Sequence, residues 1–312
     1  MLRQLRHLGA RLVRDLFDMF GFTVSRKGDY YSPLPSERQL ERTRARWNVP
    51  SALRGLRYDV QTMKSRLENY HRTYLPEFRQ LPDYDSLVSS GYGPGFPLVD
   101  AFASYSTLRE LRPTQYLEIG SGLSTYYAFL AGKQNQEEGH ACQITCIEPY
   151  PYERLSQLTG IELIVREVQD VPLARFEALN SGDVLFIDSS HVVRIDGDVP
   201  YLFLEVLPAL APGVIVHIHD IPFPYNIPYP AEYWTLLSES GAPHWPMYWT
   251  EAMLLQAFLA YNSEFEVLLS CPILRHHDES FVQAMIPYAR TVTVQPNTYS
   301  SIWLRKRSPL PS

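Results

Sequence analysis

Short apolar runs alternate with segments of helical periodicity along most of this chain, from residue 86 onward. The runs contain few polar positions, which is typical of strands buried on both faces of a parallel sheet. They lie at residues 116–119, 144–148, 162–165, 183–188 and 214–220. Helices are expected between them at 124–130, 152–158 and 199–210. The pattern therefore predicts a sheet whose strands alternate with helices.

Two further apolar runs, 265–269 and 301–305, are expected to pair as a C-terminal antiparallel hairpin on this mostly parallel sheet. Strands that alternate with helices form a doubly wound, Rossmann-like α/β/α sandwich of three layers, because the crossover helices cover both faces of the sheet. Ligands of such folds bind at the carboxyl ends of the strands. We therefore expect the functional residues directly after the apolar runs.

The first 85 residues are predicted to form a helical N-terminal extension to an α/β domain at 86–312. Apolar residues at helical spacing, interleaved with arginines, predict an amphipathic helix over 2–20. These apolar residues are Leu2, Leu5, Leu8, Leu12, Leu16, Met19 and Phe20. A second stripe, from Val60 to Tyr74, predicts a helix ended by Pro76. The first helix suits either peripheral contact with an anionic membrane or packing on a neighbouring domain or subunit.

Composition narrows the class of protein. The chain has 312 residues with 45% hydrophobic content, enough for one large core. Its three cysteines, Cys142, Cys146 and Cys271, lack metal-site spacing and indicate cytoplasmic thiols. Neither a membrane span nor the apolar core of a secretion signal is evident in the sequence. Residues 1–79 hold 16 Lys+Arg against 8 Asp+Glu, and the remainder holds 12 against 26. The acidic remainder argues against nucleic acid as a partner.

The turn after the first apolar run carries the most specific chemistry. It reads Glu118-Ile119-Gly120-Ser121-Gly122, and the second run ends in Glu148. Glycines let a backbone turn approach a ligand closely, and an acid at the end of the next strand can accept both ribose hydroxyls. The third glycine of the dinucleotide fingerprint is missing. An acid before the turn suits a cationic ligand, so the sequence favours S-adenosylmethionine over a dinucleotide.

Together with Asp170, Asp188 and the end of the fifth run, these residues resemble the class I S-adenosylmethionine-dependent methyltransferases over about residues 86–306. More narrowly, residues 91–96 and 186–191 resemble bacterial members found beside polysaccharide-biosynthesis genes. The resemblance implies O-methylation of a small-molecule or saccharide hydroxyl. It also implies the cofactor-binding residues, which are Glu118, Gly120, Ser121 and Gly122 at the methionine part, Glu148 at the ribose and Asp170 at the adenine.

Acidic residues and histidines follow the fourth and fifth runs. In catechol-type O-methyltransferases such positions bind a divalent metal, and the matching residues here are Asp188, His219 and Asp220. A histidine where a carboxylate is usual disfavours magnesium. The alternative, which we favour, is a general base, either His191 or His219, without an obligatory metal. Strand alternation puts His217 on the same face as His219, and His217 is expected to be structural.

A segment rich in proline and aromatic residues, 222–249, follows the fifth run and is predicted to form a rigid cap over the acceptor. Other functions on the same fold stay open, namely aminopropyl transfer, an oxidoreductase, or a non-catalytic cofactor-binding partner of a glycan-assembly complex. The sequence does not determine the acceptor, metal dependence or oligomeric state.

Overall fold

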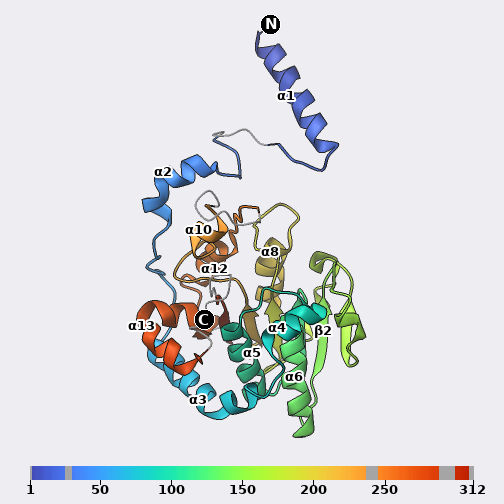
Figure 1. Ribbon diagram of the computed structural model, residues 1–312, viewed down its shortest axis with the longest axis vertical. Helices are drawn as coiled ribbons and strands as arrows, with labels where there is room; N and C mark the ends of the chain where they lie inside the picture. Colours follow the sequence, from blue (N-terminus) through green and yellow to red (C-terminus); the bar gives the residue numbers. More distant parts are fainter. Residues whose placement is uncertain (1, 25–29, 237–244, 288–298, 309–312) are drawn as a thin grey trace.

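The computed structural model describes residues 2–24, 30–236, 245–287 and 299–308 (Figure 1). Its centre is a seven-stranded sheet in the order β3-β2-β1-β4-β5-β7-β6. The parallel strands are β1 (Gln115–Ile119), β2 (Gln143–Ile147), β3 (Ile161–Ile164), β4 (Val184–Ile187) and β5 (Ile215–Ile218). Strand β7 (Ile302–Lys306) runs antiparallel to β5 and to β6 (Phe265–Ser270). The predicted sheet and its antiparallel pair are therefore confirmed.

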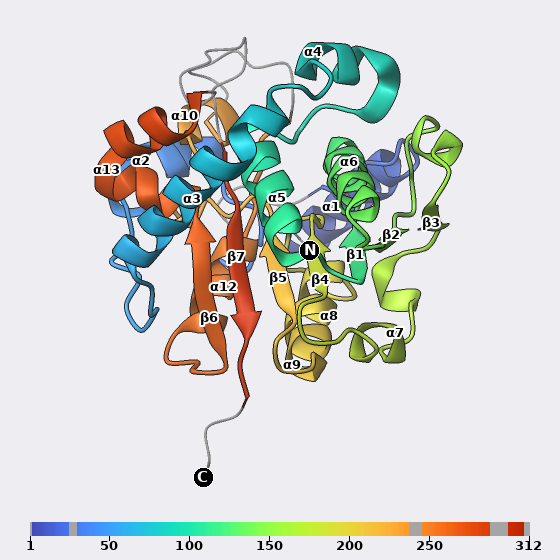
Figure 2. The same ribbon diagram turned by 90° about the horizontal axis from the view of Figure 1, so that it is seen from below.

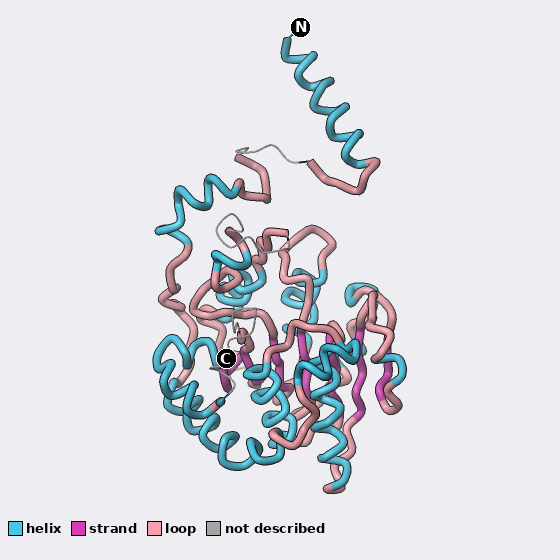
Figure 3. The backbone as a smooth tube through the Cα atoms, viewed as in Figure 1, coloured by secondary structure: helices cyan, strands magenta, loops and turns pink. Residues whose placement is uncertain are grey.

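Helices cover both faces of this sheet, which completes the predicted three layers. Helices α5 (Leu98–Leu111) and α6 (Leu123–Glu137) lie side by side on one face, with α3 (Val60–Phe78) packed on α5 (Figure 2). The other face is covered by the helical segment 198–209, which consists of α8 (Asp198–Tyr201), η4 (Leu202–Val206) and α9 (Leu207–Ala209), and by α12 (Glu251–Leu259). Every residue of β4 and β5 is buried, as expected for strands between two helical layers. Figure 3 shows the strands as one row between helices and long loops.

Two elements differ from the sequence prediction. The expected helix at 152–158 is only the single turn η2 (Leu155–Gln157), because it lies between the prolines at 149 and 151 and Gly160, whose φ is +95°. Helix α3 continues through Pro76 to Phe78, although the sequence predicted an end at Pro76. A proline so close to the end of a helix removes few hydrogen bonds, so the helix tolerates it there.

The N-terminal region contains α1 (Leu2–Asp18), α2 (Glu37–Trp47) and α3. Figure 1 shows α1 standing apart from the sheet and its helices. Helix α3 instead buries Met63, Leu67 and Tyr70 completely. The boundary at residue 85 stays a prediction. In the part of the chain that the structure describes, no helix is both long and apolar enough to cross a bilayer.

The remaining helical elements lie before β1 or in the connections between strands. They are α4 (Tyr84–Leu87), η1 (Val88–Tyr92), η3 (Val168–Asp170), α7 (Ala174–Glu177), α10 (Ala231–Trp234) and α13 (Cys271–Met285). Helix α13 separates β6 from β7, so these strands pair without a tight hairpin turn. Residues 237–244 of the predicted cap lie outside the described residues.

Candidate functional site

The glycine turn lies between the end of β1 and the start of α6. Gly120 has φ +98°, and a Cβ there would come within 2.7 Å of the carbonyl oxygen of Asp188. Both facts require glycine, since a side chain would be strained and would also push the ends of β1 and β4 apart. Ser121 follows, and the Gly122 amide donates to Thr125 Oγ1 at 3.0 Å as α6 begins. The turn is thus held close to the residue that follows β4.

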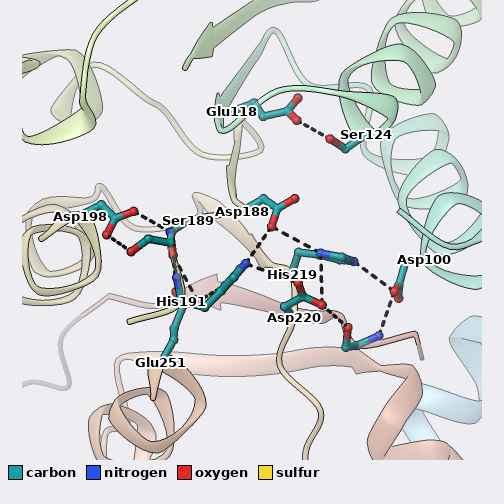
Figure 4. A network of polar contacts seen from close by, with 12 residues as sticks. Asp100, Glu118, Ser124, Asp188, Ser189, His191, Asp198, His219, Asp220 and Glu251 are labelled. Carbon is teal, nitrogen blue, oxygen red and sulfur yellow. Dashed lines mark hydrogen bonds and ion pairs between the residues drawn. The ribbon is translucent and has the colours of Figure 1, made fainter. Parts of the chain in front are cut away.

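Glu118 lies beneath this turn and reaches no solvent. The Ser124 hydroxyl of α6 donates to its Oε1 at 2.5 Å (Figure 4). Burial raises the pKa of Glu118 to about 8, because an ionised carboxylate is costly away from water. The site therefore has a carboxyl group whose charge depends on what binds beside it.

The other two acids predicted to bind the cofactor follow the neighbouring strands. Glu148 comes directly after β2, is half-buried, and accepts a hydrogen bond from the Tyr150 amide at 2.8 Å. Asp170 ends the η3 turn after β3 and is exposed. Because β1, β2 and β3 are parallel neighbours, these acids and the glycine turn lie at one edge of the sheet.

The glycine-rich loop at 91–96 lies against this turn. A Cβ on Gly122 would stand 3.3 Å from the carbonyl oxygen of Tyr92. Gly93 has φ +83°, and a Cβ on it would overlap the ring of Tyr152 in the loop after β2. The loop resembled the family in sequence, and the structure places it next to the turn.

Acidic residues and histidines gather at the ends of β4 and β5 (Figure 4). His191 Nε2 lies 3.3 Å from Asp188 Oδ1 and 3.4 Å from Asp220 Oδ2. His219 Nδ1 lies 3.5 Å from the same Asp188 oxygen and 3.7 Å from Asp220 Oδ1. The structure therefore brings together all four residues that the sequence analysis placed at this edge.

His191 is held from behind by residues that precede and begin α12. Its Nδ1 lies 2.7 Å from Glu251 Oε2, and Glu251 is only 1% exposed. The backbone amides of Thr250 and Glu251 both donate to the His191 carbonyl oxygen. The Trp249 ring lies 4.5 Å from the imidazole, between centroids. These contacts hold His191 at φ +61°, a conformation that non-glycine residues rarely adopt without such support.

His219 has a buried carboxylate behind it as well. Asp100, in the first turn of α5, places Oδ2 at 3.3 Å from His219 Nε2, and both side chains are buried. The same Asp100 oxygen also accepts a hydrogen bond from the Ser300 amide at 2.9 Å. Sequence reasoning missed Asp100 and Glu251. The only signal was an acid in the first turn of an otherwise apolar helix, which normally indicates helix capping.

The charges in this cluster depend on one another. Burial opposes ionisation of Asp188, but the neighbouring His219 and His191 outweigh it and hold the pKa of Asp188 well below its usual value. Burial also opposes charge on both histidines. Hydrogen bonds to Asp188 and Glu251 nevertheless raise the pKa of His191 well above its usual value. The charges of Asp220 and Asp188 do the same for the pKa of His219. The imidazoles therefore bind protons tightly in this site.

His217 lies on the same side of β5 as His219 but inside the core. Both rings face Phe186 and Phe96. His217 stacks on Trp303 at 3.9 Å between ring centroids, and its Nε2 lies 2.9 Å from Ser301 Oγ. Burial lowers the pKa of His217 well below its usual value, so it is neutral. These contacts give it a packing role.

The cluster also contains donors suited to a divalent cation. Asp188, His191 and Asp220 offer ligand atoms that all lie within 4.8 Å of one another. This set differs from the predicted one, since His191 stands where His219 was expected. Two carboxylates and an imidazole fit a transition-metal ion, and metal-bound imidazoles commonly donate their other N–H to a carboxylate, as Glu251 would accept here. The residues present therefore fit such an ion.

Comparison with known proteins finds one matching family within this chain. Residues 117–221, which include the glycine turn and the cluster, match a family described as a methyltransferase domain. This match places a methyltransferase domain at residues 117–221, and the mostly parallel sheet agrees with the α/β fold expected of one.

Individual relatives are distant. An uncharacterized protein of Archaeoglobus fulgidus is 26% identical over 197 residues, which cover 57% of this chain and 87% of that protein. The solved O-methyltransferase TomG from Streptomyces achromogenes is 17% identical, with a TM-score of 0.37 over 81% of this chain and 92% of TomG. An O-methyltransferase from Bacillus cereus is 14% identical, with a TM-score of 0.35 over 78% and 91% of the two chains. Structural similarity at this level carries no argument about function.

Proposed function

We propose that the protein transfers the methyl group of S-adenosylmethionine to a hydroxyl of a small-molecule or saccharide acceptor. One observation supports this most strongly. The glycine turn expected to hold the methyl donor stands directly against Asp188, whose side chain belongs to the histidine–carboxylate cluster. A donor in the turn and an acceptor hydroxyl at the cluster would therefore be neighbours, which is the main requirement of methyl transfer.

The cofactor would lie along the edge formed by β1, β2 and β3. Gly120, Ser121 and Gly122 would lie under its methionine part, with Glu118 behind them. Glu148 would accept hydrogen bonds from the ribose hydroxyls and Asp170 would contact the adenine. Support comes from their order, because the glycine turn, Glu148 and Asp170 follow β1, β2 and β3, which are neighbours in the sheet.

In the reaction, the acceptor oxygen attacks the methyl carbon in line with the carbon–sulfur bond. The new oxygen–carbon bond forms as the carbon–sulfur bond breaks, which leaves S-adenosylhomocysteine. The hydroxyl proton passes to a base, and His191 Nε2 or an imidazole nitrogen of His219 is suitably placed. Because the pKa values of both imidazoles are raised, a base mechanism predicts that the rate rises with pH as the imidazole loses its proton.

A metal-assisted reaction is the second candidate, favoured by the spacing of the three donors. Asp188, His191 and Asp220 would hold a divalent cation. Such an ion lowers the pKa of a hydroxyl bound to it. The two candidates differ in one measurement, activity after exhaustive chelation. If a general base carries the reaction, the protein should keep its activity after chelation. If chelation abolishes activity and added manganese or magnesium restores it, the metal-assisted mechanism is correct instead.

The function itself is tested by calorimetry with S-adenosylmethionine and NAD, followed by transfer of a labelled methyl group to a panel of phenolic and saccharide acceptors. We expect the protein to bind S-adenosylmethionine but not NAD, and to label at least one acceptor. The Asp188→Asn variant should lose this labelling and still bind S-adenosylmethionine. Binding of NAD would sink the proposal. Cofactor binding without any labelled acceptor would favour the non-catalytic partner of a glycan-assembly complex.

A further inference from the structure

An exposed apolar surface on α1 and the six residues after it has no part in the site described above. Every residue from 9 to 24 is exposed. The large apolar side chains among them are Leu12, Val13, Leu16, Phe17, Met19, Phe20, Phe22 and Val24, here called the α1 surface. Met19 and Phe20 are 76% and 69% exposed. A continuous apolar surface of this kind marks a site of interaction.

The positions of apolar and basic residues divide α1 into two sides. Leu12 and Leu16 are four residues apart, as are Val13 and Phe17, so these apolar residues share one side of the helix. Arg11 and Arg14 are three residues apart and fall on the opposite side, together with Asp15 and Asp18. Residues 2–24 hold four arginines against two aspartates. Helix α1 is therefore apolar on one side and polar on the other, and together with the residues after it carries a net positive charge.

We propose that the α1 surface binds this protein to an anionic lipid membrane, with α1 lying in the plane of the interface. Helices of this pattern insert their apolar side at the boundary of headgroups and acyl chains, while the arginines contact anionic headgroups. Contact between the α1 helices of two copies of the chain is a weaker candidate, because it would bring two positively charged segments together. Residues 80–312 hold 12 Lys+Arg against 26 Asp+Glu, so attraction to anionic lipid is concentrated in the N-terminal region.

The location of α1 predicts how the protein is oriented on the membrane. Figure 1 shows α1 beyond the end of the molecule that carries α2 and α10. Helix α2 is joined to α10 by an ion pair between Arg44 and Glu232, and Asn48 donates to the same carboxylate at 3.5 Å. Helix α10 belongs to the aromatic segment 222–249, whose Trp249 ring lies against the His191 imidazole. Binding through α1 would therefore turn this end of the protein towards the membrane.

Sedimentation of the full-length protein with vesicles tests this proposal, which is independent of methyl transfer. The vesicles contain phosphatidylcholine alone or with about a third phosphatidylserine. The apolar side is tested by Leu16→Gln with Phe20→Gln, and the charge by Arg11→Gln with Arg14→Gln. A matched control is Ile195→Gln with Leu204→Gln, because these exposed apolar residues lie outside the α1 surface. Far-UV circular dichroism and the thermal midpoint confirm that each variant is folded.

We expect the protein to partition onto anionic vesicles at least tenfold more strongly than onto neutral ones, and less strongly as salt rises. Each α1 variant should lose at least tenfold in partitioning, whereas the control should match the unaltered protein. Equal binding by the Leu16→Gln, Phe20→Gln variant, or no binding by the unaltered protein, would overturn the proposal. A dimer in lipid-free solution that the same variant converts to a monomer would assign the surface to a second copy instead.

Discussion

At the scale of single residues, Glu251 is the side chain that most directly controls His191. Its carboxylate holds Nδ1 of the imidazole, which leaves Nε2 facing Asp188 and Asp220. That orientation serves a general base and a metal ligand equally, because both functions use Nε2. Glu251 is therefore a positioning residue in either mechanism.

Substitution Glu251→Gln keeps the shape but removes the charge that stabilises the imidazole. We expect kcat to fall by about 10- to 100-fold, as for other supports of functional histidines, and the affinity for S-adenosylmethionine to change less than twofold. The pH–rate profile should also shift to lower pH, because His191 loses one of the carboxylates that raise its pKa. Glu205→Gln, on the exposed side of η4, is the control. An unchanged profile would refute the positioning role.

Glu118 gives a prediction about stability and pH. Its pKa in the folded protein is about 8, above the ordinary value of 4.5, so the folded state holds a proton that the unfolded state has released. The free energy of unfolding then falls as pH rises between these values, by at most about 1.4 kcal/mol per pH unit. Glu118→Gln should remove this loss, so the variant becomes progressively more stable than the unaltered protein from pH 5 to pH 8.

Urea unfolding at several pH values measures the effect, with Glu153→Gln in an exposed loop as the control. A cation bound beside Glu118 would lower its pKa, so added S-adenosylmethionine should reduce the difference between the two proteins. If the difference in free energy of unfolding between the two proteins does not vary with pH, Glu118 is ionised in the folded protein over the whole range from pH 5 to pH 8.

The residues of the site were predictable to the extent that they follow strands. Asp188, His219 and Asp220 come at strand ends, which hydrophobic patterning locates, and His191 is three residues from one of them. Glu251 is 60 residues from His191, and Asp100 lies before the first strand. Nothing in local periodicity reports such distant contacts, because they depend on how helices pack around the finished sheet.

At the scale of elements, Arg109 joins three helices. It lies in α5, is 4% exposed, and its Nε donates to Glu77 of α3 at 2.7 Å. It also contacts Asn135 at the end of α6 and Glu138 just beyond it. A buried guanidinium with three partners fixes the angles between α3, α5 and α6, and removing it takes a charged donor from all three partners.

We expect Arg109→Met to lower the free energy of unfolding by about 2–4 kcal/mol, measured by urea denaturation. Arg112→Met is a matched control, because Arg112 pairs with the same Glu138 at 2.8 Å but its side chain is 45% exposed. An exposed pair contributes about 0–1 kcal/mol. Equal losses in the two variants would mean that burial of Arg109 adds nothing.

The strands were the most predictable elements and the short helices the least. Buried parallel strands are continuous apolar runs, so β1 to β5 could be located from patterning alone. The segment 152–158 has a helical pattern too, but only Leu155 of its turn is buried. Helix formation needs a buried face as well as periodicity, and most of this segment has none.

At the scale of the whole molecule, the sequence places a boundary at residue 85, whereas the packing ties α3 to the α/β layers. Met63, Leu67 and Tyr70 are fully buried, and Tyr70 accepts a hydrogen bond from Thr107 of α5 at 3.1 Å. Residues before α3 also bond to the body, since the Ser51 amide donates to the Pro224 carbonyl oxygen at 2.8 Å. By contrast, α2 has no buried residue.

Two truncations, 48–312 and 86–312, therefore distinguish the boundaries. The longer fragment loses α1, α2 and the partly exposed ion pair of Arg44 with Glu232. Their loss should cost about 1 kcal/mol or less, so the thermal midpoint should stay within a few degrees. The shorter fragment loses α3 and uncovers the apolar face of α5. Each large apolar side chain that loses its burial costs about 1.5–3 kcal/mol, and the sum over α3 is comparable to the whole stability of a domain.

We expect the 86–312 fragment to aggregate or unfold without a cooperative transition. Cooperative unfolding of that fragment near the midpoint of the full chain would instead establish residue 85 as the domain boundary.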